Sequence, residues 1–361
     1  MTDVDLDRGV IGGVDTHGAT HHAAVIDVIG RHIADREFGA DSGGHAALAA
    51  WLAGHGQVIS VGVEGTGSYG AQLARALTAA GITVIEVDRP DRKARRAQGK
   101  SDPLDAYAAA MAVASGRAGG TPKTRDGLVE AIRALHVARR GAVKARTATL
   151  NQIKALLITA PAGLRERLAP LGTAELITTC ARARPGADLG CPAAATKKAL
   201  RALARRWQLL DAEAGEHERD ITALVRTANP ALLALPGCGP ITAAQLLISA
   251  GDNPERMRTE GAFAHLTGTA PIPASSGRTH RHRLSRGGDR QANNALHMIA
   301  ITRLGHDQRT REYAERRTSE GLSKKDIIRC LKRYIAREVF KALTCTNTTT
   351  PGANPQVATT S

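Results

Sequence analysis

Short apolar runs alternate with helical patterns between residues 9 and 88 of the chain. The runs are rich in Val and Ile, which predicts strands, whereas the stretches between them carry apolar residues at helical spacing. One predicted helix is closed by Gly81, a typical residue at a helix end. Strands that alternate with helices favour an α/β fold with a mixed sheet. The predicted strands cover 9–15, 22–29, 57–64 and 82–88, and the predicted helices cover 45–54 and 71–81.

The middle of the chain has a helical pattern. From about 103 to 157, apolar residues recur at helical spacing with Arg and Lys between them, and a second such stretch covers 194–228. The intervening segment, 160–192, is rich in Pro, Gly and Ala, which indicates an irregular connection. Two long charged helices joined in this way predict either an antiparallel coiled-coil arm or two ordinary surface helices.

A further domain begins near LPGCGPITA, which starts at Leu235. Helices are predicted within 284–305 and 323–343, and a polar, basic loop precedes the first of them. The last residues are polar and of low complexity, which predicts disorder. The predicted segments are an α/β domain at 9–125, a helical arm at 126–228, a mainly α domain at 229–345 and a tail at 346–361.

The charge of the chain favours a polyanionic partner. Lys and Arg number 49 against 34 for Asp and Glu, which gives a formal net charge of +15 and a pI near 10.2. Cationic contacts with phosphates release counterions, so DNA or RNA fits this charge, although an anionic membrane surface would also attract it. Aromatic residues make up 2% of the chain, too few for a protein that binds single strands by stacking bases.

Cysteine usage and the N-terminal residues favour a cytoplasmic protein. The five cysteines are odd in number and form no CxxC pair, which disfavours a disulfide framework or a structural zinc site. The acidic start MTDVDLDRGV lacks the pattern of a signal peptide, and no apolar run approaches the length of a membrane span. We therefore expect a cytoplasmic protein without a membrane segment.

Four carboxylates stand where they could form one site. Asp15 and Glu64 each end an apolar run with strand character, and groups at the carboxyl ends of strands line the ligand crevice of open α/β sheets. Asp102 and Asp105 lie three residues apart at the start of a helical stretch and therefore share a helix face. Converging carboxylates repel one another unless cations neutralise them. Two Mg²⁺ ions would do so, and they would promote in-line attack on a phosphodiester.

Each of these carboxylates also has a purely structural interpretation. Asp102 followed by Pro103 is an ordinary helix start with Asp as the N-cap, and Asp105 then suits the helix dipole. Asp15 and Glu64 could be plain strand-end residues. The strand pair combined with the helix pair is more specific than any single residue, but spacing alone leaves both interpretations open.

A glycine-rich turn in LPGCGPITA is a candidate for phosphate contact. Gly237 and Gly239 resemble the turn of a helix-hairpin-helix element, where backbone N–H groups can approach a phosphate and the next helix N-terminus lies behind them. The alternative is a simple Gly- and Pro-rich linker between helices.

The segment 271–290 combines two serines with a cluster of basic residues. A hydroxyl of Ser275 or Ser276 can attack a phosphodiester if nearby cations bind the scissile phosphate. The basic residues could instead form a sequence-independent grip on phosphates, which composition alone favours. The candidate nucleic-acid-binding arginines are Arg278, Arg281, Arg283, Arg286 and Arg290.

Taken together, these motifs resemble those of the DEDD transposases of bacterial insertion sequences, to which the Piv-type DNA invertases are related. Each motif alone is weak, but their order and spacing over about residues 9–340 are specific. The resemblance implies a RuvC-like, RNase-H-type N-terminal domain, a coiled-coil arm and a C-terminal transposase domain. The motifs are GVDTH, VGVEGTGSY, KSDPLDA, LPGCGPITA, and APIPASSG followed by RHRLSRGGDRQANNALH.

The resemblance also implies roles for the site residues. The family's catalytic serine lies in the loop that follows Pro271, where the register points to Ser276, with Ser275 as the runner-up. This serine would form a transient covalent link to DNA, next to an acidic tetrad that holds Mg²⁺. The residues that correspond to the tetrad are Asp15, Glu64, Asp102 and Asp105.

Partners are implied in the same way. The family's site is a composite in which the tetrad of one subunit meets the serine of another, which implies a dimer or tetramer acting on donor and target duplex DNA at the nucleoid. Some members use a structured RNA from their own element as a guide. Such an RNA would suit the basic helical stretch at 132–154.

Two other functions remain open at this point. In a metal-dependent junction-resolving nuclease, the tetrad would cut DNA by water attack, without a covalent intermediate, and the serine loop would only bind phosphates. In a nonenzymatic nucleic-acid-binding protein, Mg²⁺ would not affect binding and no DNA product would form. The large C-terminal half speaks against a minimal resolvase.

Overall fold

The computed structural model describes residues 9–87, 101–278 and 282–344, which fall into two compact units. Unit 1 comprises the chain up to Arg125 together with Gly251–Arg258, and unit 2 comprises Asp126–Ala250 and the chain from Thr259 onward. The predicted tail at 346–361 lies outside the described residues. None of the described helices is both long and apolar enough to cross a membrane.

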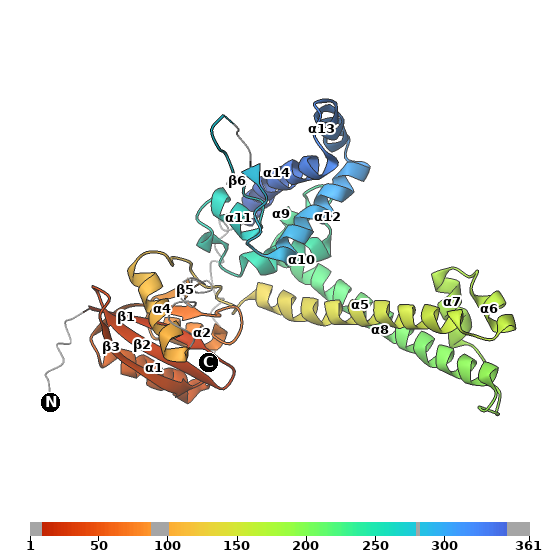
Figure 1. Ribbon diagram of the computed structural model, residues 1–361, viewed down its shortest axis with the longest axis horizontal. Coiled ribbons are helices and arrows are strands. Elements are labelled where there is room, and N and C mark those ends of the chain that lie inside the picture. The colour runs from red at the N-terminus through yellow and green to blue at the C-terminus, as the bar shows by residue number, and fades with distance from the viewer. Residues whose placement is uncertain (1–8, 88–100, 279–281, 345–361) are drawn as a thin grey trace, which may run out of the picture. The chain divides into compact units, whose positions relative to one another are not determined.

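Unit 1 is built on a five-stranded mixed sheet in the order β3-β2-β1-β4-β5 (Figure 1). Strand β1 pairs antiparallel with β2 and parallel with β4, while β3 is antiparallel to β2 and β5 is parallel to β4. This mixed sheet is compatible with an RNase-H-like domain. The elements are β1 (Gly9–Thr16), β2 (Thr20–Asp27), β3 (His32–Gly39), α1 (Ser42–Ala53), β4 (Gln57–Glu64), α2 (Ala71–Ala79), β5 (Val84–Val87) and α4 (Asp102–Ala114).

The four strands predicted from apolar runs are present, but the pattern did not predict β3. Strand β3 is an edge strand with mostly exposed side chains, and its sequence HIADREFG contains no apolar run. Its backbone pairs with β2 all the same, since hydrogen bonding along a ladder does not require buried side chains.

Helices cover both faces of the sheet, and this follows from the alternation of side chains along each strand. Val10 and Val14 of β1 belong to a buried cluster with Leu52 of α1 and Leu77 of α2. Ile11 points to the opposite face, where it packs with Ala110 of α4. Because helices cover both faces of the sheet, a ligand would approach it from the ends of its strands. Asp15 and Glu64 lie at the C-terminal ends of β1 and β4.

Unit 2 contains two long helices that pack along each other. The ion pairs Arg139–Glu218 and Arg146–Asp211 link them, so residue numbers rise along one helix as they fall along the other. The helices are therefore antiparallel, and their coiled-coil character stays a prediction. They are α5 (Leu128–Ile158) and α8 (Pro192–Ala228).

The segment 160–192 was predicted to be irregular, and this prediction is wrong. It contains two short helices, α6 (Ala162–Leu168) and α7 (Thr173–Ala181). Leu164 and Leu176 are buried in one cluster with Ile153 of α5 and Leu200 of α8. The apolar positions are spaced for helices, but the surrounding Pro and Gly residues obscure that spacing.

The continuous helical pattern from 103 to 157 is interrupted in the structure. Helix α4 ends at Ala114 in unit 1, and α5 begins at Leu128 in unit 2. The rest of unit 2 is mainly helical, with one short β-hairpin. Its elements are α9 (Pro230–Leu233), α10 (Pro240–Ala250), α11 (Glu260–Leu266), β6 (Ile272–Pro273), β7 (His282–Arg283), α12 (Arg290–His306), α13 (Gln308–Ser319) and α14 (Lys324–Thr344).

Candidate active site

Two of the predicted carboxylates stand side by side at the end of the sheet. Strands β1 and β4 are parallel, and their last register pair is Val14 with Val63. The next residues are Asp15 and Glu64, so their Cα atoms are at the same level of neighbouring strands. Asp15 is 6% exposed and Glu64 is partly buried.

Two glycines allow α4 to approach this face of the sheet closely. A Cβ atom at Gly13 would lie 2.2 Å from the carbonyl oxygen of Ala106, and one at Gly62 would lie 2.8 Å from that of Ala109. Neither position tolerates a side chain, because the atoms it would meet belong to the helix backbone. Gly13 is two residues before Asp15 and Gly62 two before Glu64, so all four lie on the face that α4 covers.

The first turn of α4 supplies the other two predicted carboxylates. The sequence favoured Asp102 as the N-cap, but the helix begins at Asp102, and Ser101 is the extended capping residue. Asp105 is buried, with 3% of its surface exposed, whereas Asp102 is partly exposed. Both are acidic residues in the first turn, where the helix dipole stabilises a negative charge.

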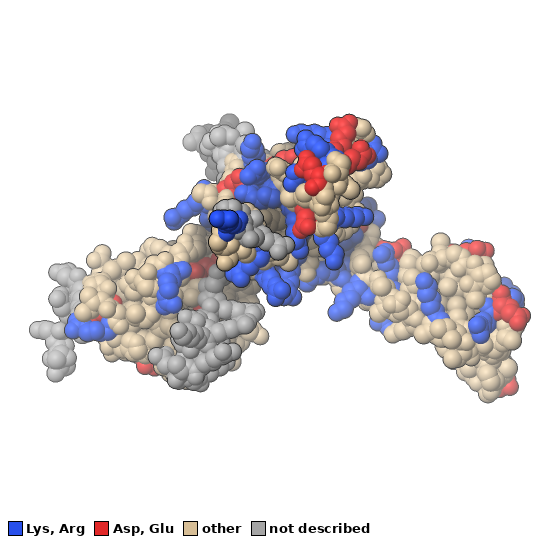
Figure 2. Space-filling model, turned by 45° about the horizontal axis from the view of Figure 1, so that its top comes forward, with Lys and Arg blue, Asp and Glu red and all other residues tan. Residues whose placement is uncertain are grey.

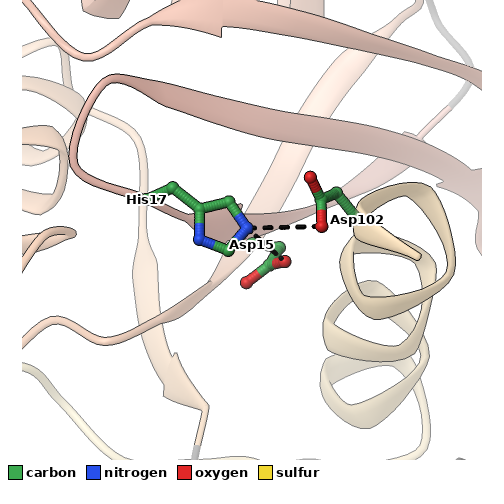
Figure 3. Close-up of side chains that lie close together, drawn as sticks. All are labelled: Asp15, His17 and Asp102. Carbon is green, nitrogen blue, oxygen red and sulfur yellow. Dashed lines mark ion pairs between the residues drawn. The ribbon is translucent and has the colours of Figure 1, made fainter. Parts of the chain in front are cut away.

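Asp15 and Asp102 meet around His17 (Figure 3). The Nε2 atom of His17 lies 3.2 Å from Oδ2 of Asp15 and 3.3 Å from Oδ1 of Asp102. One ligand atom from each residue lies within 4.8 Å of the others, which is close enough to hold one metal ion. Two carboxylates and an imidazole form a donor set that suits a divalent cation.

The structure brings together half of the predicted tetrad in that cluster. Glu64 and Asp105 are not members of it, although Glu64 lies at the same end of the sheet as Asp15, and Asp105 lies in the same helix turn as Asp102. His17 was not singled out from the sequence. Its position two residues after Asp15 in VDTHG was the available signal, because the chain turns directly after β1.

A pair of histidines lies on the opposite face of the sheet. His21 of β2 and His45 of α1 are buried, their Nε2 atoms are 3.3 Å apart, and their rings stack at a centroid distance of 5.3 Å. Burial lowers the pKa of His21, and the nearby His45 lowers it further. Burial also lowers the pKa of His45, against a smaller opposing effect of Asp41. Both shifts favour the neutral form of the two imidazoles.

The predicted serine loop lies in unit 2, between β6 and β7. These strands pair Ile272 with Arg283 and Pro273 with His282. Ser275 and Ser276 are exposed in the loop, as a nucleophile for a large substrate must be. Of the predicted nucleic-acid-binding arginines, Arg278, Arg283, Arg286 and Arg290 are exposed, and Arg281 lies outside the described residues.

The glycine turn before α10 has a packing role at one of its two positions. Gly237 has a φ of +74°, and a Cβ there would lie 3.2 Å from the carbonyl oxygen of Ile299 in α12. Arg303 of α12 donates from Nε to the carbonyl oxygen of Pro236 at 2.7 Å. Gly239 has no atom within 4 Å of a Cβ placed there. A phosphate-binding role for either glycine stays a prediction.

Two parts of the chain match models of known protein families. Residues 12–160 match a family model described as a transposase, of the DEDD type found in IS110 elements. Residues 229–315 match the model described as transposase IS116/IS110/IS902 family. The chain belongs to the IS110/IS116 transposase family. The first match contains Asp15, His17 and Asp102, and the second contains the serine loop.

Individual relatives resemble parts of this family member. It is 32% identical over 129 residues to the uncharacterized 43.6 kDa protein of insertion element IS110 from Streptomyces coelicolor, which is 35% of this chain and 32% of that protein. It is 30% identical over 122 residues to the 42 kDa protein of IS900 from Mycobacterium paratuberculosis, covering 33% and 31%. It is 33% identical over 156 residues to a probable family 20 transposase of Pseudomonas aeruginosa, covering 42% and 44%. The chain thus aligns with less than half the length of each.

Proposed function

We propose that this chain is the DNA transposase of a bacterial insertion sequence and that it cuts and exchanges DNA strands. The observation that carries the proposal is the cluster of Asp15, His17 and Asp102 at the open end of a mixed sheet, inside the segment that matches DEDD transposases. The excess of Lys and Arg over Asp and Glu suits a DNA substrate.

The donor set of the cluster fits a divalent metal ion, and in this proposal the ion is Mg²⁺, with two ions per site. Asp15 and Asp102 would hold one ion, and Glu64 and Asp105 would complete the site from the neighbouring strand and helix turn. When bound, the metal withdraws charge from a phosphate oxygen and so promotes attack at phosphorus. His17 would supply a third ligand atom to that ion, because its Nε2 atom lies next to both carboxylates.

Ser276 is the nucleophile in this proposal, and Ser275 is the runner-up. The Ser276 Oγ atom forms an ester bond to phosphorus while the bond from phosphorus to one sugar oxygen breaks. The serine proton passes to solvent water, and the sugar oxygen takes up a proton from water and leaves as a hydroxyl group. The exposed position of Ser276 among the arginines that follow it supports this role, because cations stabilise the charge that develops on the phosphate.

The proposal extends to partners. The substrates are donor and target duplex DNA, and a structured RNA encoded by the element guides their choice. The protein acts as a dimer or tetramer in which the acidic site of one subunit works with the serine of another. The basic residues along α5 between positions 132 and 154 support an RNA or DNA partner there.

The test is a strand-transfer assay with purified protein, Mg²⁺, the element's flanking RNA and DNA that carries the element junction. Denaturing gels would reveal a covalent protein–DNA adduct. We expect Ser276→Ala and Asp15→Ala to abolish the adduct, and Ser319→Ala on the exposed surface of α13 to leave it intact. An adduct that survives Ser276→Ala but not Ser275→Ala would move the nucleophile to Ser275. Clean cleavage that no serine change affects would indicate a metal-dependent nuclease instead.

A further inference from the structure

A cavity of about 330 Å³ opens within unit 2 at the base of the β6–β7 hairpin, which carries the serine loop and is called the serine hairpin below. One wall is formed by residues 268–271, which precede β6, together with β7 and the two residues after it, and the other wall by α14. The basic residues that line it come from both walls. They are His282, Arg283, Arg329, Lys332, Arg333 and Arg337.

The carboxylates around this cavity balance only part of its positive charge. Arg329 pairs with Asp326 at 2.8 Å, and Arg333 and Arg337 share Glu260. Arg283 and Lys332 have no carboxylate partner among the residues that the structure describes. Five guanidinium and ammonium groups therefore face two carboxylates, and a net positive charge is left in the cavity.

Lys332 is the most unusual of these groups, because it is partly buried without a counter-charge. Its Nζ atom donates to the neutral Oδ1 of Asn293 at 2.8 Å. Asn293 is itself held in place, since its Nδ2 donates to the carbonyl oxygen of Thr267 at 2.7 Å. Burial lowers the pKa of Lys332, and the nearby Arg329 lowers it further. A desolvated ammonium group next to other cations destabilises the fold, unless an anion binds.

A second cavity, of about 300 Å³, continues from the first along the same loop. Leu284 and Ser285 line both, and the second is also lined by Arg286, Asp289, Arg290 and Asn293, so that its two guanidinium groups outnumber its one carboxylate. The two cavities form a basic path beside the serine hairpin. Figure 2 shows Lys and Arg side chains gathered over the C-terminal helices on the face in view. Such a path suits a chain of phosphates better than a single small anion.

We propose that this cavity binds a backbone phosphate of the DNA strand that runs beside the serine loop, with Lys332 and Arg283 as its cationic ligands. The identity of the ligand as DNA rests on the proposed function. The second cavity would accept the neighbouring phosphate through Arg286 and Arg290. These contacts position the strand for the serine loop and carry no base sequence information.

The test is the salt dependence of binding, measured by fluorescence anisotropy with a labelled DNA duplex that carries the element junction. Lys332→Met removes the charge and keeps the apolar part of the side chain. We expect binding about tenfold weaker at about 0.1 M salt. The slope of log affinity against log salt concentration should be shallower by about one, because one phosphate contact is lost. Lys341→Met is the matched control, because Lys341 is exposed on the same helix and does not line the cavity. Lys332→Arg should restore most of the affinity.

A stability measurement separates this role from a structural one. Because Lys332 is partly desolvated without a counter-ion, Lys332→Met should leave the thermal unfolding midpoint unchanged or raise it, while binding falls. Equal losses of DNA affinity in Lys332→Met and Lys341→Met would overturn the proposal, as would a loss confined to a structured RNA of equal length. DNA binding does not require strand transfer, so the binding result would remain valid even if Ser276 were not the nucleophile.

Discussion

At the residue scale, the acidic site is organised around a histidine. Two carboxylates from distant parts of the sequence approach one imidazole nitrogen, at 3.2 Å for Asp15 and 3.3 Å for Asp102. His17 therefore links the end of β1 to the first turn of α4. When a metal ion binds, the same three ligand atoms can surround it.

Metal binding at this cluster predicts a stability effect. Mg²⁺ or Mn²⁺ that binds only the folded chain should raise the unfolding temperature of unit 1. At a metal concentration of 100 times the dissociation constant, the free energy of unfolding should increase by about 2.7 kcal/mol. Asp102→Asn should remove most of that rise. Asp41→Asn should retain it, because Asp41 caps α1 and Asn serves as well at an N-cap. A metal-induced rise of equal size in Asp102→Asn would argue against this site.

The buried histidine pair predicts that unit 1 weakens in acid. Since burial lowers the pKa of His21 and His45 below the usual value of 6.5, the unfolded chain binds more protons than the folded chain as the pH falls through that value. The free energy of unfolding should therefore be greatest above about pH 6.5 and decrease below it. Trp51 fluorescence during urea unfolding, with Trp207→Phe as background, would report unit 1 alone.

A matched pair of variants tests that pH effect. His45→Leu should flatten the decrease in stability between about pH 7 and pH 5.5, because one buried titratable group is gone and His45 no longer lowers the pKa of His21. His55→Asn, a change at a partly exposed histidine that packs on Trp51, should leave the decrease intact. The same pH profile in all three proteins would show that the histidine pair does not cause it.

At the scale of elements, helix α4 and the sheet must be in close contact for the carboxylates to meet. Gly13→Ala would place a methyl group 2.2 Å from the backbone of α4 and should destabilise unit 1 by about 3 kcal/mol. It should also reduce the metal-induced rise in unfolding temperature, since α4 carries Asp102. Gly119→Ala, where nothing lies within 4 Å, is the control. Wild-type metal response in Gly13→Ala would contradict the packing argument.

Periodicity in the sequence predicted most elements, and its failures have physical causes. Apolar runs located β1, β2, β4 and β5 because those strands are buried. Strand β3 was missed because it lies at an edge with polar side chains. Helices α6 and α7 were missed because Pro and Gly interrupt a short apolar pattern.

The candidate site was predicted only in part from the sequence. Strand ends located Asp15 and Glu64, and the helix start located Asp102 and Asp105. The contact of His17 with two of them depends on the turn after β1 and on the packing of α4 against Gly13, and no periodicity encodes either.

At the scale of the whole molecule, the chain of unit 1 is not continuous. The segment Gly251–Arg258 belongs to it, although the sequence pattern placed these residues in the C-terminal domain. Arg256 donates to Glu86 at 2.8 Å and to the carbonyl oxygen of Thr121 at 2.7 Å, and Asn253 donates to the carbonyl oxygen of Pro122 at 3.0 Å. Folding of the acidic domain therefore depends on residues far along the chain.

Arg256→Ala should destabilise unit 1 by about 1.5–3 kcal/mol, because it removes a charge-assisted hydrogen bond from a side chain that is 10% exposed. The unfolding transition reported by Trp51 should shift, and the one reported by Trp207 should not. Arg258→Ala, at an exposed position nearby, should shift neither. Equal shifts of both transitions in Arg256→Ala would mean that the two units do not unfold separately.

The central proposal is that a metal site on the sheet and a serine in unit 2 together exchange DNA strands. The most direct measurement is mass spectrometry of the peptide that carries DNA after a reaction with junction DNA and Mg²⁺. We predict a nucleotide attached to Ser276, and no attached nucleotide when Asp15 is changed to Asn. A nucleotide on a residue outside the serine loop, or cleaved DNA without any modified peptide, would contradict this mechanism.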